Sequence, residues 1–285
     1  MLGSHDMKRI LDDIGYGLVI VLVVLAVIFL LAPLGMAALM SFDSRTFLGP
    51  FPPPDLSFGW YGKFFSNEFY VRGLKTSLIL AFTAASISTV SGVAAAVVLD
   101  RYRFPGRDVL LAFFLSPLMV PGVVIGFALL LFFALIGVFD GFARLLGGHI
   151  IVTLPYTIRA TLAGLVGIKR SLSEAALSLG ANERQAFWDI TFPLGKTGMV
   201  AGAIFAFAIS MDDVAASIFL TDPTSLTLPV AMVSMMRTTF DLSIAAGAVM
   251  LIALTILLIV LLDRMVGLRR VVGQGMYRSE KRDSE

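Results

Sequence analysis

Long runs of apolar residues, separated by short polar connections, make up most of the chain and define its predicted elements. A helix that crosses the hydrocarbon core of a bilayer needs about 20 mainly apolar residues. Within lipid, only helices and closed barrels satisfy their own backbone polar groups. Six runs meet the length requirement, at about residues 15–40, 74–99, 109–137, 149–168, 197–220 and 243–263. The pattern therefore predicts an all-α, polytopic membrane protein with six transmembrane helices.

Composition supports a chain that resides in lipid. Of the 285 residues, 58% are hydrophobic and 15% are charged, whereas a soluble domain is about 45–50% apolar and about 25% charged. The mean hydropathy of +0.90 agrees. The absence of cysteine excludes disulfides, thiolate metal sites and cysteine nucleophiles. Two histidines, His5 and His149, are too few for a histidine-based metal cluster.

The ends of the chain are expected to be cytoplasmic. Residues 1–6 fall in MLGSHDM, which is typical of an expression-tag remnant, and residues 1–14 form the N-terminal cytoplasmic segment. The first apolar run is longer than the 7–15 residues or so of a signal-peptide core, which favours a retained helix. We expect a membrane domain over 15–268, with a cytoplasmic loop at 169–196, and a cytoplasmic tail over 269–285.

Basic residues set the predicted orientation. With a cytoplasmic N-terminus, the segments on the cytoplasmic side hold 15 of the 22 lysines and arginines. Such an excess follows the positive-inside rule. Both termini and the loop between the fourth and fifth runs are therefore predicted to be cytoplasmic.

That loop is polar and has helical spacing, in SEAALSLGANERQAFWDITFPLGKTG at 173–198. Ser173 can cap a helix that begins at Glu174. Gly180 permits a positive φ angle or a close approach by another surface. A second short helix is expected over 182–190, ended by Pro193. The pattern leaves open a hairpin lying on the membrane or a docking site for a cytoplasmic partner.

The segment EAALSLGANERQAFWDITFPL resembles the cytoplasmic signature loop of permease subunits of bacterial ABC importers. That family has Glu-Ala-Ala, three residues, Gly, about nine residues, then Ile, one residue and Leu-Pro. The chain departs from it only at Phe192, which stands where the family has Leu. The matching positions are Glu174, Ala175, Ala176, Gly180, Ile190 and Pro193.

A broader resemblance, over about residues 8–270, is to the second permease of spermidine/putrescine-type importers. It is carried by SFGWYGKFF, DRYRFPGRD, SPLMVPGVVIGFALLLFF and FAFAISMDDVAASIFLTDPTSLTLPVAMVSMMR. The resemblance implies a type I ABC importer fold (MetI-like) in the bacterial inner membrane. As substrate it favours a small cationic organic solute such as a polyamine. Opines, amino-acid derivatives and phosphonates stay open as alternatives.

The same resemblance implies that the loop is a coupling helix, seated in a groove on an ATP-hydrolysing subunit. The implied partners are two copies of that ATP-binding subunit, a second homologous permease, a periplasmic or extracellular solute-binding protein and membrane lipid, but no nucleic acid. The partner subunits would bind ATP and Mg, so this chain would need no cofactor. The expected contact residues are Glu174, Ala175, Ala176, Leu179, Gly180, Ala181 and Arg184.

Asp212 and Asp213 lie within the fifth apolar run. An ionised carboxylate at the bilayer centre costs about 2.5–3.5 kcal/mol on insertion scales, so each needs water, a partner or a cationic ligand. Adjacent helical residues point about 100° apart, so we expect one of the two to face a central path. One interpretation is that this carboxylate draws an ammonium-bearing substrate through the membrane. The other is that the pair binds Arg159 or backbone groups and only sets helix packing.

Other features separate the remaining protein classes. Gly122–Gly126 and Gly198–Gly202 have the spacing of close helix contacts. The chain lacks GxxxxGK[ST] and any nucleophile–base pair, so we expect no enzyme activity of its own. An ion-driven secondary carrier remains the alternative function, although no internal repeat supports it.

Overall fold

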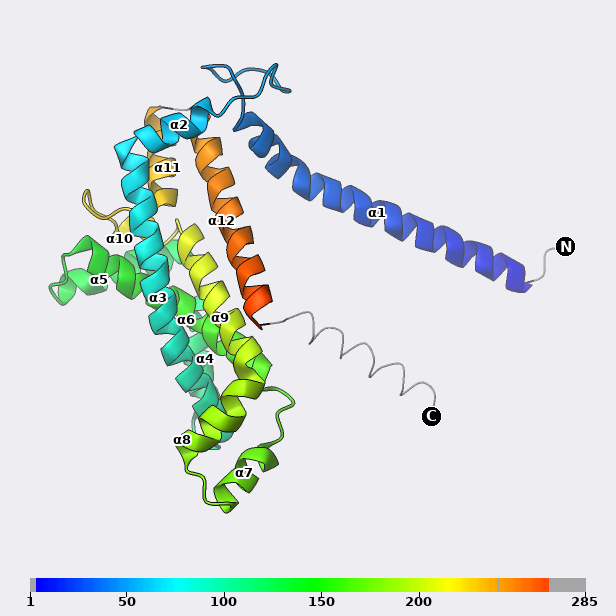
Figure 1. Ribbon diagram of the computed structural model, residues 1–285, viewed down its shortest axis with the longest axis vertical. Coiled ribbons are helices and arrows are strands. Elements are labelled where there is room, and N and C mark those ends of the chain that lie inside the picture. The colour runs from blue at the N-terminus through cyan, green and yellow to red at the C-terminus, as the bar shows by residue number, and fades with distance from the viewer. Residues whose placement is uncertain (1–3, 240, 267–285) are drawn as a thin grey trace. The chain divides into compact units, whose positions relative to one another are not determined.

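The computed structural model describes residues 4–239 and 241–266. Helices dominate this part of the chain, and its only β pairing is an isolated bridge between Asp43 and Leu56. The predicted all-α class is therefore confirmed. The described residues divide into two compact units, and their elements are labelled in Figure 1. Unit 1 combines those of 1–66 with those of 239–250, and unit 2 combines 67–238 with the helical residues from 251 onward.

Unit 1 contains α1 (Ser4–Met40), α2 (Gly59–Ser66) and the beginning of α12 (Ser243–Val266). The most apolar window of α1 lies within Gly15–Met40, and none of that window is buried by the other elements of unit 1. Such a surface is not stable in water, so it needs to be covered by lipid or by protein.

A small core joins α2 to the start of α12 within unit 1. Trp60, Leu242 and Ala246 are buried together there. Lys63 Nζ lies 2.7 Å from Asp241 Oδ2 and 5.0 Å from the centre of the Trp60 ring. An ion pair and a cation–π contact thus reinforce the apolar contact.

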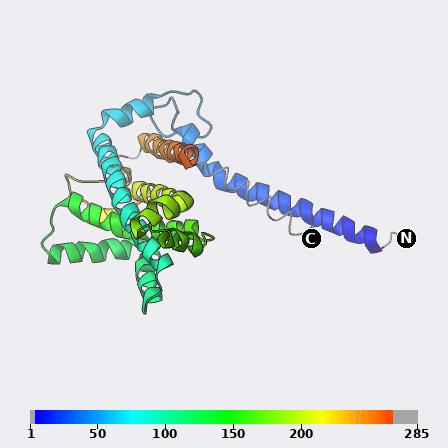
Figure 2. The same ribbon diagram turned by 60° about the horizontal axis from the view of Figure 1, so that its bottom comes forward.

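The centre of unit 2 is formed by α3 (Glu68–Arg101), α6 (Gly141–Leu165) and α9 (Phe192–Asp212), which pack side by side (Figure 2). Hydroxyl groups bridge α3 and α6. Ser88 Oγ lies 2.7 Å from Thr153 Oγ1, and Thr157 Oγ1 donates to the Ser88 carbonyl at 2.9 Å. Within an apolar bundle, such bonds satisfy buried polar groups and fix the register of the helices.

Both predicted pairs of small residues lie at close contacts. A Cβ atom on Gly198 would lie 2.6 Å from Gly164 Cα, so α9 and α6 touch through their backbones. A Cβ atom on Gly126 would lie 2.7 Å from Ala216 Cα. Each glycine allows an approach that any larger residue would prevent.

The third apolar run, 109–137, is not one straight helix. It divides into α4 (Arg107–Leu115), a short 3-10 turn and α5 (Gly122–Leu135), and the two parts of the run are bent by 104°. Pro117 lies at the start of the turn and Pro121 directly precedes α5. Proline lacks a backbone N–H and clashes with the preceding turn, so two in five residues interrupt the helix.

Helix length and apolarity alone do not yield six spans. In the described part of the chain, three helices are long and apolar enough to cross a membrane: Gly15–Met40, Glu68–Arg101 and Glu183–Asp212. The number rises to five if α4–α5, and α6 with the following α7 (Arg170–Ser178), each count as one bent span. The apolar part of α12, Ser243–Leu258, is shorter. Six spans and cytoplasmic termini therefore stay predictions.

Candidate functional site: the 169–196 loop and the aspartate pair

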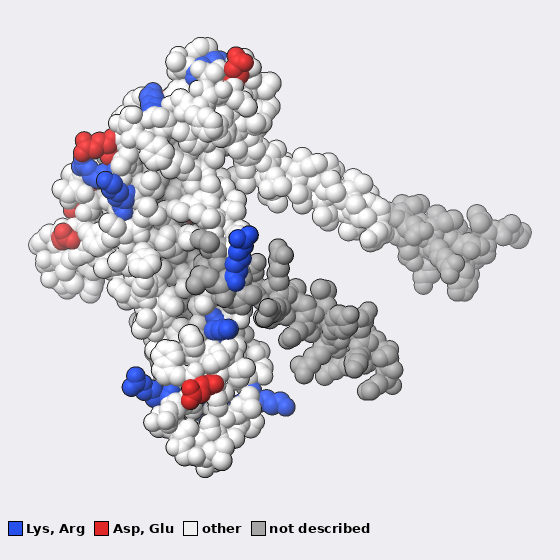
Figure 3. Space-filling model, viewed as in Figure 1, with Lys and Arg blue, Asp and Glu red and all other residues white. Residues whose placement is uncertain are grey.

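The loop begins with α7, which starts four residues earlier than predicted. We expected Ser173 to cap a helix beginning at Glu174, but the N-cap is Lys169 and its side chain makes no capping bond. The start is set instead by the backbone turn at Gly167, which has φ +89°. Charged side chains of both signs gather at this end of unit 2, around α7 and the short α8 (Glu183–Ala186) (Figure 3).

Gly180 ends α7 in the conformation that the sequence indicated, with φ +94°. Its N–H donates to the Leu177 carbonyl at 3.0 Å, and the Ala181 N–H donates to the Ala176 carbonyl at 3.0 Å. These two bonds form a Schellman motif, which satisfies the last carbonyls of a helix. A residue with a side chain would be strained here, so glycine gives the loop a sharp and defined tip.

Most of the predicted contact residues point into open space. Glu174, Ala175, Leu179, Gly180 and Arg184 are exposed, whereas Ala176 and Ala181 are half-buried. Leu179 is 90% exposed at the tip, which leaves an apolar side chain available to a partner. In the described residues neither Glu174 nor Arg184 forms an ion pair, so their charges are equally available.

The second half of the loop runs into α9 without a break. Asn182 and Gln185 form a capping box that starts α8, with bonds of 2.8 and 2.9 Å. We expected Pro193 to end this helix, which is wrong. A π-helical turn over Phe187–Thr191 follows α8, and Pro193 lies in the first turn of α9. The Phe192 N–H reaches back five residues to the Phe187 carbonyl. This wider turn accommodates a proline whose own N–H is missing.

Two arginines fasten the loop to the end of α3. Arg101 Nη1 lies 2.8 Å from Glu183 Oε2, and its Nη2 donates to Thr191 Oγ1 at 3.4 Å. Arg170 donates to the carbonyl of Asp100. Sequence reasoning missed these contacts, because the partners are 70 to 90 residues apart and no local pattern links them.

The two aspartates have different surroundings. α9 ends at Asp212, and Asp213 is extended, with φ −67° and ψ 119°. Asp213 Oδ2 accepts from both the N–H and the hydroxyl of Ser217, each at 2.8 Å, and the Ala216 N–H donates to Oδ1 at 3.4 Å. Asp213 therefore accepts from free N–H groups at the start of the next turn, α10 (Ser217–Leu220), whose N-cap residue is Ala216. Asp212 is exposed and has no ion pair within the described residues.

The expected alternative partner of this pair, Arg159, does not reach it. Arg159 is exposed on α6 and forms no salt bridge within the described ranges. The interpretation that Arg159 neutralises the aspartates is therefore wrong. Its companion interpretation, that backbone groups bind one of them, holds for Asp213 because the break in the helix exposes free N–H groups.

His149 is the polar residue that sequence reasoning did not connect with this site. It lies on α6 with 1% of its surface exposed. Its Nδ1 is 2.7 Å from Ser210 Oγ and its Nε2 is 2.9 Å from Ser217 Oγ. Asp213 Oδ2 lies 4.0 Å from Nε2. A lone histidine inside an apolar run was the available signal, because such a residue needs partners when it is buried.

A loop that follows α10 is fixed by Asp222. Its Oδ2 accepts from the Gly141 N–H at 2.9 Å, at the start of α6, and its Oδ1 accepts from the hydroxyl and N–H of Thr224 and the N–H of Ser225. The hydrogen bond from the Thr224 hydroxyl is the largest influence on the Asp222 carboxyl and lowers its pKa. Burial raises the pKa, but the backbone N–H groups of Ser225, Thr224 and Gly141 lower it further, so the net shift is downward.

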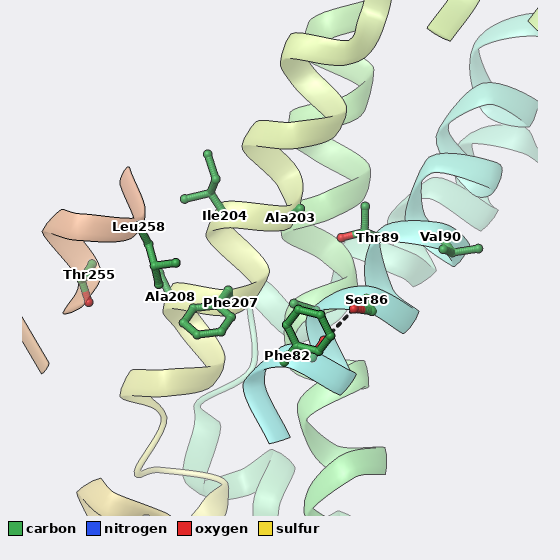
Figure 4. Close-up of a pocket in the computed structure, with 11 residues that line it drawn as sticks. Phe82, Ser86, Thr89, Val90, Ala203, Ile204, Phe207, Ala208, Thr255 and Leu258 are labelled. Carbon is green, nitrogen blue, oxygen red and sulfur yellow. Dashed lines mark hydrogen bonds between the residues drawn. The ribbon is translucent and has the colours of Figure 1, made fainter. Parts of the chain in front are cut away.

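A groove of about 440 Å³ between α3, α9 and α12 is apolar (Figure 4). Its polar groups are the hydroxyls of Ser86, Thr89 and Thr255, and two of these donate to carbonyls of their own helices. The groove contains no charged side chain, so it offers no counter-ion to an ammonium ion or to an anion. Its chemistry fits a lipid chain or an apolar helix. It is lined by Phe82, Ala85, Ser86, Thr89, Val90, Ala203, Ile204, Phe207, Ala208, Thr255 and Leu258.

Comparison with known proteins now adds the family. Residues 88–269 match the family described as binding-protein-dependent transport system inner membrane component. The chain belongs to this family. It is therefore a multi-pass inner-membrane permease subunit of a binding-protein-dependent importer, and the predicted family is confirmed.

Several relatives are transport permeases. The chain is 33% identical over 205 residues to the spermidine/putrescine transport system permease protein PotC of Haemophilus influenzae, covering 72% of this chain and 80% of that one. It is 31% identical over 225 residues to the putrescine transport system permease protein PotI of Escherichia coli K12, covering 76% and 79%. A sulfate permease of the Chlamydomonas reinhardtii chloroplast is 33% identical over 156 residues, covering 50% and 42%.

Solved structures confirm the fold. A chain of a bacterial alginate ABC transporter, crystallised with an alginate pentasaccharide-bound periplasmic protein, superposes with a TM-score of 0.71 at 17% identity, covering 94% of this permease and 97% of that chain. A chain of an amino acid ABC transporter, crystallised with histidines, gives a TM-score of 0.57 at 18% identity, covering 76% and 99%. At such identities the likeness concerns the fold alone.

Proposed function

We propose that this permease forms one half of the path by which an ATP-driven importer moves a small organic cation, such as a polyamine. The 169–196 loop would be its coupling helix. The observation that carries the proposal is the tip at Leu179–Gly180, which is exposed, sharply defined and part of a segment that continues into α9.

Polyamine is the favoured substrate for two reasons. First, PotC and PotI, which are named as permeases of spermidine/putrescine and putrescine systems, align with about three quarters of this chain. In addition, Asp212 presents a carboxylate without an ion pair in the described part of the chain. A carboxylate in an apolar span is stable when it faces water or a cation. The likeness to a sulfate permease covers only half of the chain.

The proposed assembly contains two ATP-binding subunits, a second homologous permease and a solute-binding protein. ATP and Mg would bind to the ATPase subunits, so this permease would hydrolyse nothing itself. In this assembly each ATPase would grip one coupling loop. Movement of the loop would pass to α9 through the π-helical turn and to α3 through Arg101.

Reconstitution in liposomes tests the proposal. The permease is inserted alone, and in parallel with both ATPase subunits, the companion permease and the binding protein. Uptake of radiolabelled spermidine and putrescine is compared with uptake of sulfate and of octopine. We expect polyamine uptake only from the complete assembly with ATP. Uptake by the permease alone under an ion gradient would show a secondary carrier instead. ATP-driven uptake of sulfate or octopine, with no uptake of polyamines, would reject the proposed substrate but keep the proposed importer.

A further inference from the structure

His149 bridges the two sides of the break that follows α9. Its Nδ1 contacts Ser210 in the last turn of α9, and its Nε2 contacts Ser217 at the start of α10. All three side chains are almost fully buried, with exposures of 1%, 2% and 0%. One imidazole on α6 therefore holds both ends of the segment in which Asp212 and Asp213 lie.

The hydrogen-bond partners assign the direction of each bond. The hydroxyl proton of Ser217 is donated to Asp213 Oδ2 at 2.8 Å, so Ser217 Oγ accepts from His149 Nε2. A neutral imidazole then accepts at Nδ1, and the donor there is the Ser210 hydroxyl. The result is a continuous chain of bonds from Ser210 through His149 and Ser217 to Asp213.

We infer that His149 is a positioning residue that fixes the direction in which Asp212 points. Asp212 is the last residue of α9, and its side chain makes no hydrogen bond or ion pair within the described residues. The direction of its carboxylate therefore depends on how the end of the helix is held. The bonds two residues before it and one residue after it both lead to this imidazole, directly or through Ser217. The inference uses the proposed role of Asp212 in the substrate path, but the geometry stands without that role.

The absence of cysteine from the chain makes a direct test possible. Asp212→Cys places a single thiol in this subunit, and its rate of modification by aminoethyl methanethiosulfonate is followed by mass spectrometry in the assembled complex. The rate is measured with native His149, with His149→Phe, which keeps a ring and removes both bonds, and with His149→Gln, which can restore the bond to Ser217. Thr153→Val is the matched control, because it removes a buried bond to Ser88 and one to the His149 carbonyl but leaves both bonds of the imidazole in place.

We expect His149→Phe to change the modification rate at least fivefold, in either direction, and His149→Gln to bring it back within about twofold of the native rate. Thr153→Val should leave the rate unchanged. Ser217→Ala is a second variant for use if His149→Phe does not assemble. We expect it to change the modification rate in the same direction as His149→Phe. An unchanged rate in both His149→Phe and Ser217→Ala, or an equal change in Thr153→Val, would overturn the inference.

A separate measurement distinguishes this inference from the proposed path. Uptake of spermidine by the complete assembly is measured with Asp212→Asn. A changed thiol rate with unaltered uptake would keep the positioning role and reject Asp212 as a path residue. Lost uptake with an unchanged thiol rate would keep the path residue and reject His149 as the residue that positions it.

Discussion

Asp212 and Asp213 are neighbours with different chemistry because α9 ends between them. A carboxylate at a helix C-terminus faces the partial negative charge of the last carbonyls. Asp213 avoids this by turning toward the N–H groups of Ala216 and Ser217, which begin the next turn. Asp212 is still helical and exposed. One residue step thus separates a hydrogen-bonded carboxylate from one that is available to a ligand.

Substitution of each aspartate should separate transport from stability. Asp212→Asn removes a charge that makes no bond inside the described chain, so we expect at least a tenfold loss of spermidine uptake with normal assembly. Asp213→Ala leaves the N–H and hydroxyl of Ser217 without their acceptor and should cost about 1–2 kcal/mol of stability, seen as a lower melting temperature of the purified complex. Equal effects of the two variants on both measurements would contradict this division.

Gly180 offers a second test at the scale of one residue. Its φ of +94° strains any other residue by about 1–2 kcal/mol, and nothing lies within 4 Å of an added Cβ. Gly180→Ala should therefore lower polyamine-stimulated ATP hydrolysis severalfold by deforming the tip. Gly137→Ala is the matched control, since its φ is +78° with equally open space. A similar loss in both variants would indicate general strain rather than a role for the tip.

At the scale of elements, the apolar helices could be predicted because a helix in lipid needs a long stretch of apolar residues. Their breaks could not all be predicted. Pro117 and Pro121 stop a helix, yet Pro155 lies inside α6 and Pro193 inside the first turn of α9. Whether a proline ends a helix depends on whether neighbouring turns can adjust, and that is decided by packing. The predicted start of α7 was wrong for a similar reason, because a backbone turn, and not a side-chain cap, begins the helix.

We expect the Arg101–Glu183 pair to contribute little to folding stability but to transmit movement of the loop to α3. The side chain of Glu183 is 61% exposed and that of Arg101 18%, so solvent still reaches the carboxylate side of the pair. Pairs that are open to solvent contribute about 0.2–1 kcal/mol. We expect Arg101→Glu to leave the melting temperature nearly unchanged but to uncouple ATP hydrolysis from uptake. The double variant Arg101→Glu with Glu183→Arg should recover part of the coupling. No recovery would show that Arg101 acts through another contact, such as the one to Thr191.

Asp222 should make the join between the α10–α11 loop (α11 is Leu228–Thr238) and α6 sensitive to acid. Its pKa is lowered in the folded chain. Its contribution to stability is therefore complete above the unfolded value of about 3.9 and is lost as pH falls through the folded pKa. Melting temperatures of the native protein and Asp222→Asn should differ at pH 7, and the difference should shrink as pH falls below about 3.9 toward the lowered folded pKa. A constant difference over this range would contradict the assignment.

At the scale of unit 2, backbone contact between α6 and α9 decides whether the bundle closes. A Cβ on Gly198 would lie 2.5 Å from the Ala160 carbonyl oxygen, which cannot move aside as a flexible side chain could. Gly198→Val should therefore reduce the yield of monodisperse permease sharply. Gly35→Val in α1, where nothing lies within 4 Å, is the control for the added apolar bulk. Normal yield from Gly198→Val, measured by size-exclusion chromatography, would contradict the packing argument.

The tip of the candidate site could be predicted from sequence because its signals are local: a glycine that ends a helix and the residues around it. The network around His149 could not, since its partners are 61 and 68 residues away and are brought together only by the bundle. The aspartates fall between these cases. The free-energy cost of a carboxylate in an apolar run singled them out as candidate site residues. Only the position at which α9 ends shows that Asp213, and not Asp212, is hydrogen-bonded within the chain.

Residues 183–212 form one apolar helical stretch of 30 residues from the loop to Asp212, with the π-helical turn inside it. At 1.5 Å per residue this rod is about 45 Å long. A tilt of about 5° at the gripped end would displace the far end by about 4 Å, more than the length of a hydrogen bond. Under the coupling proposed above, such a tilt would carry the Asp212 carboxylate beyond hydrogen-bond distance of a cation held there.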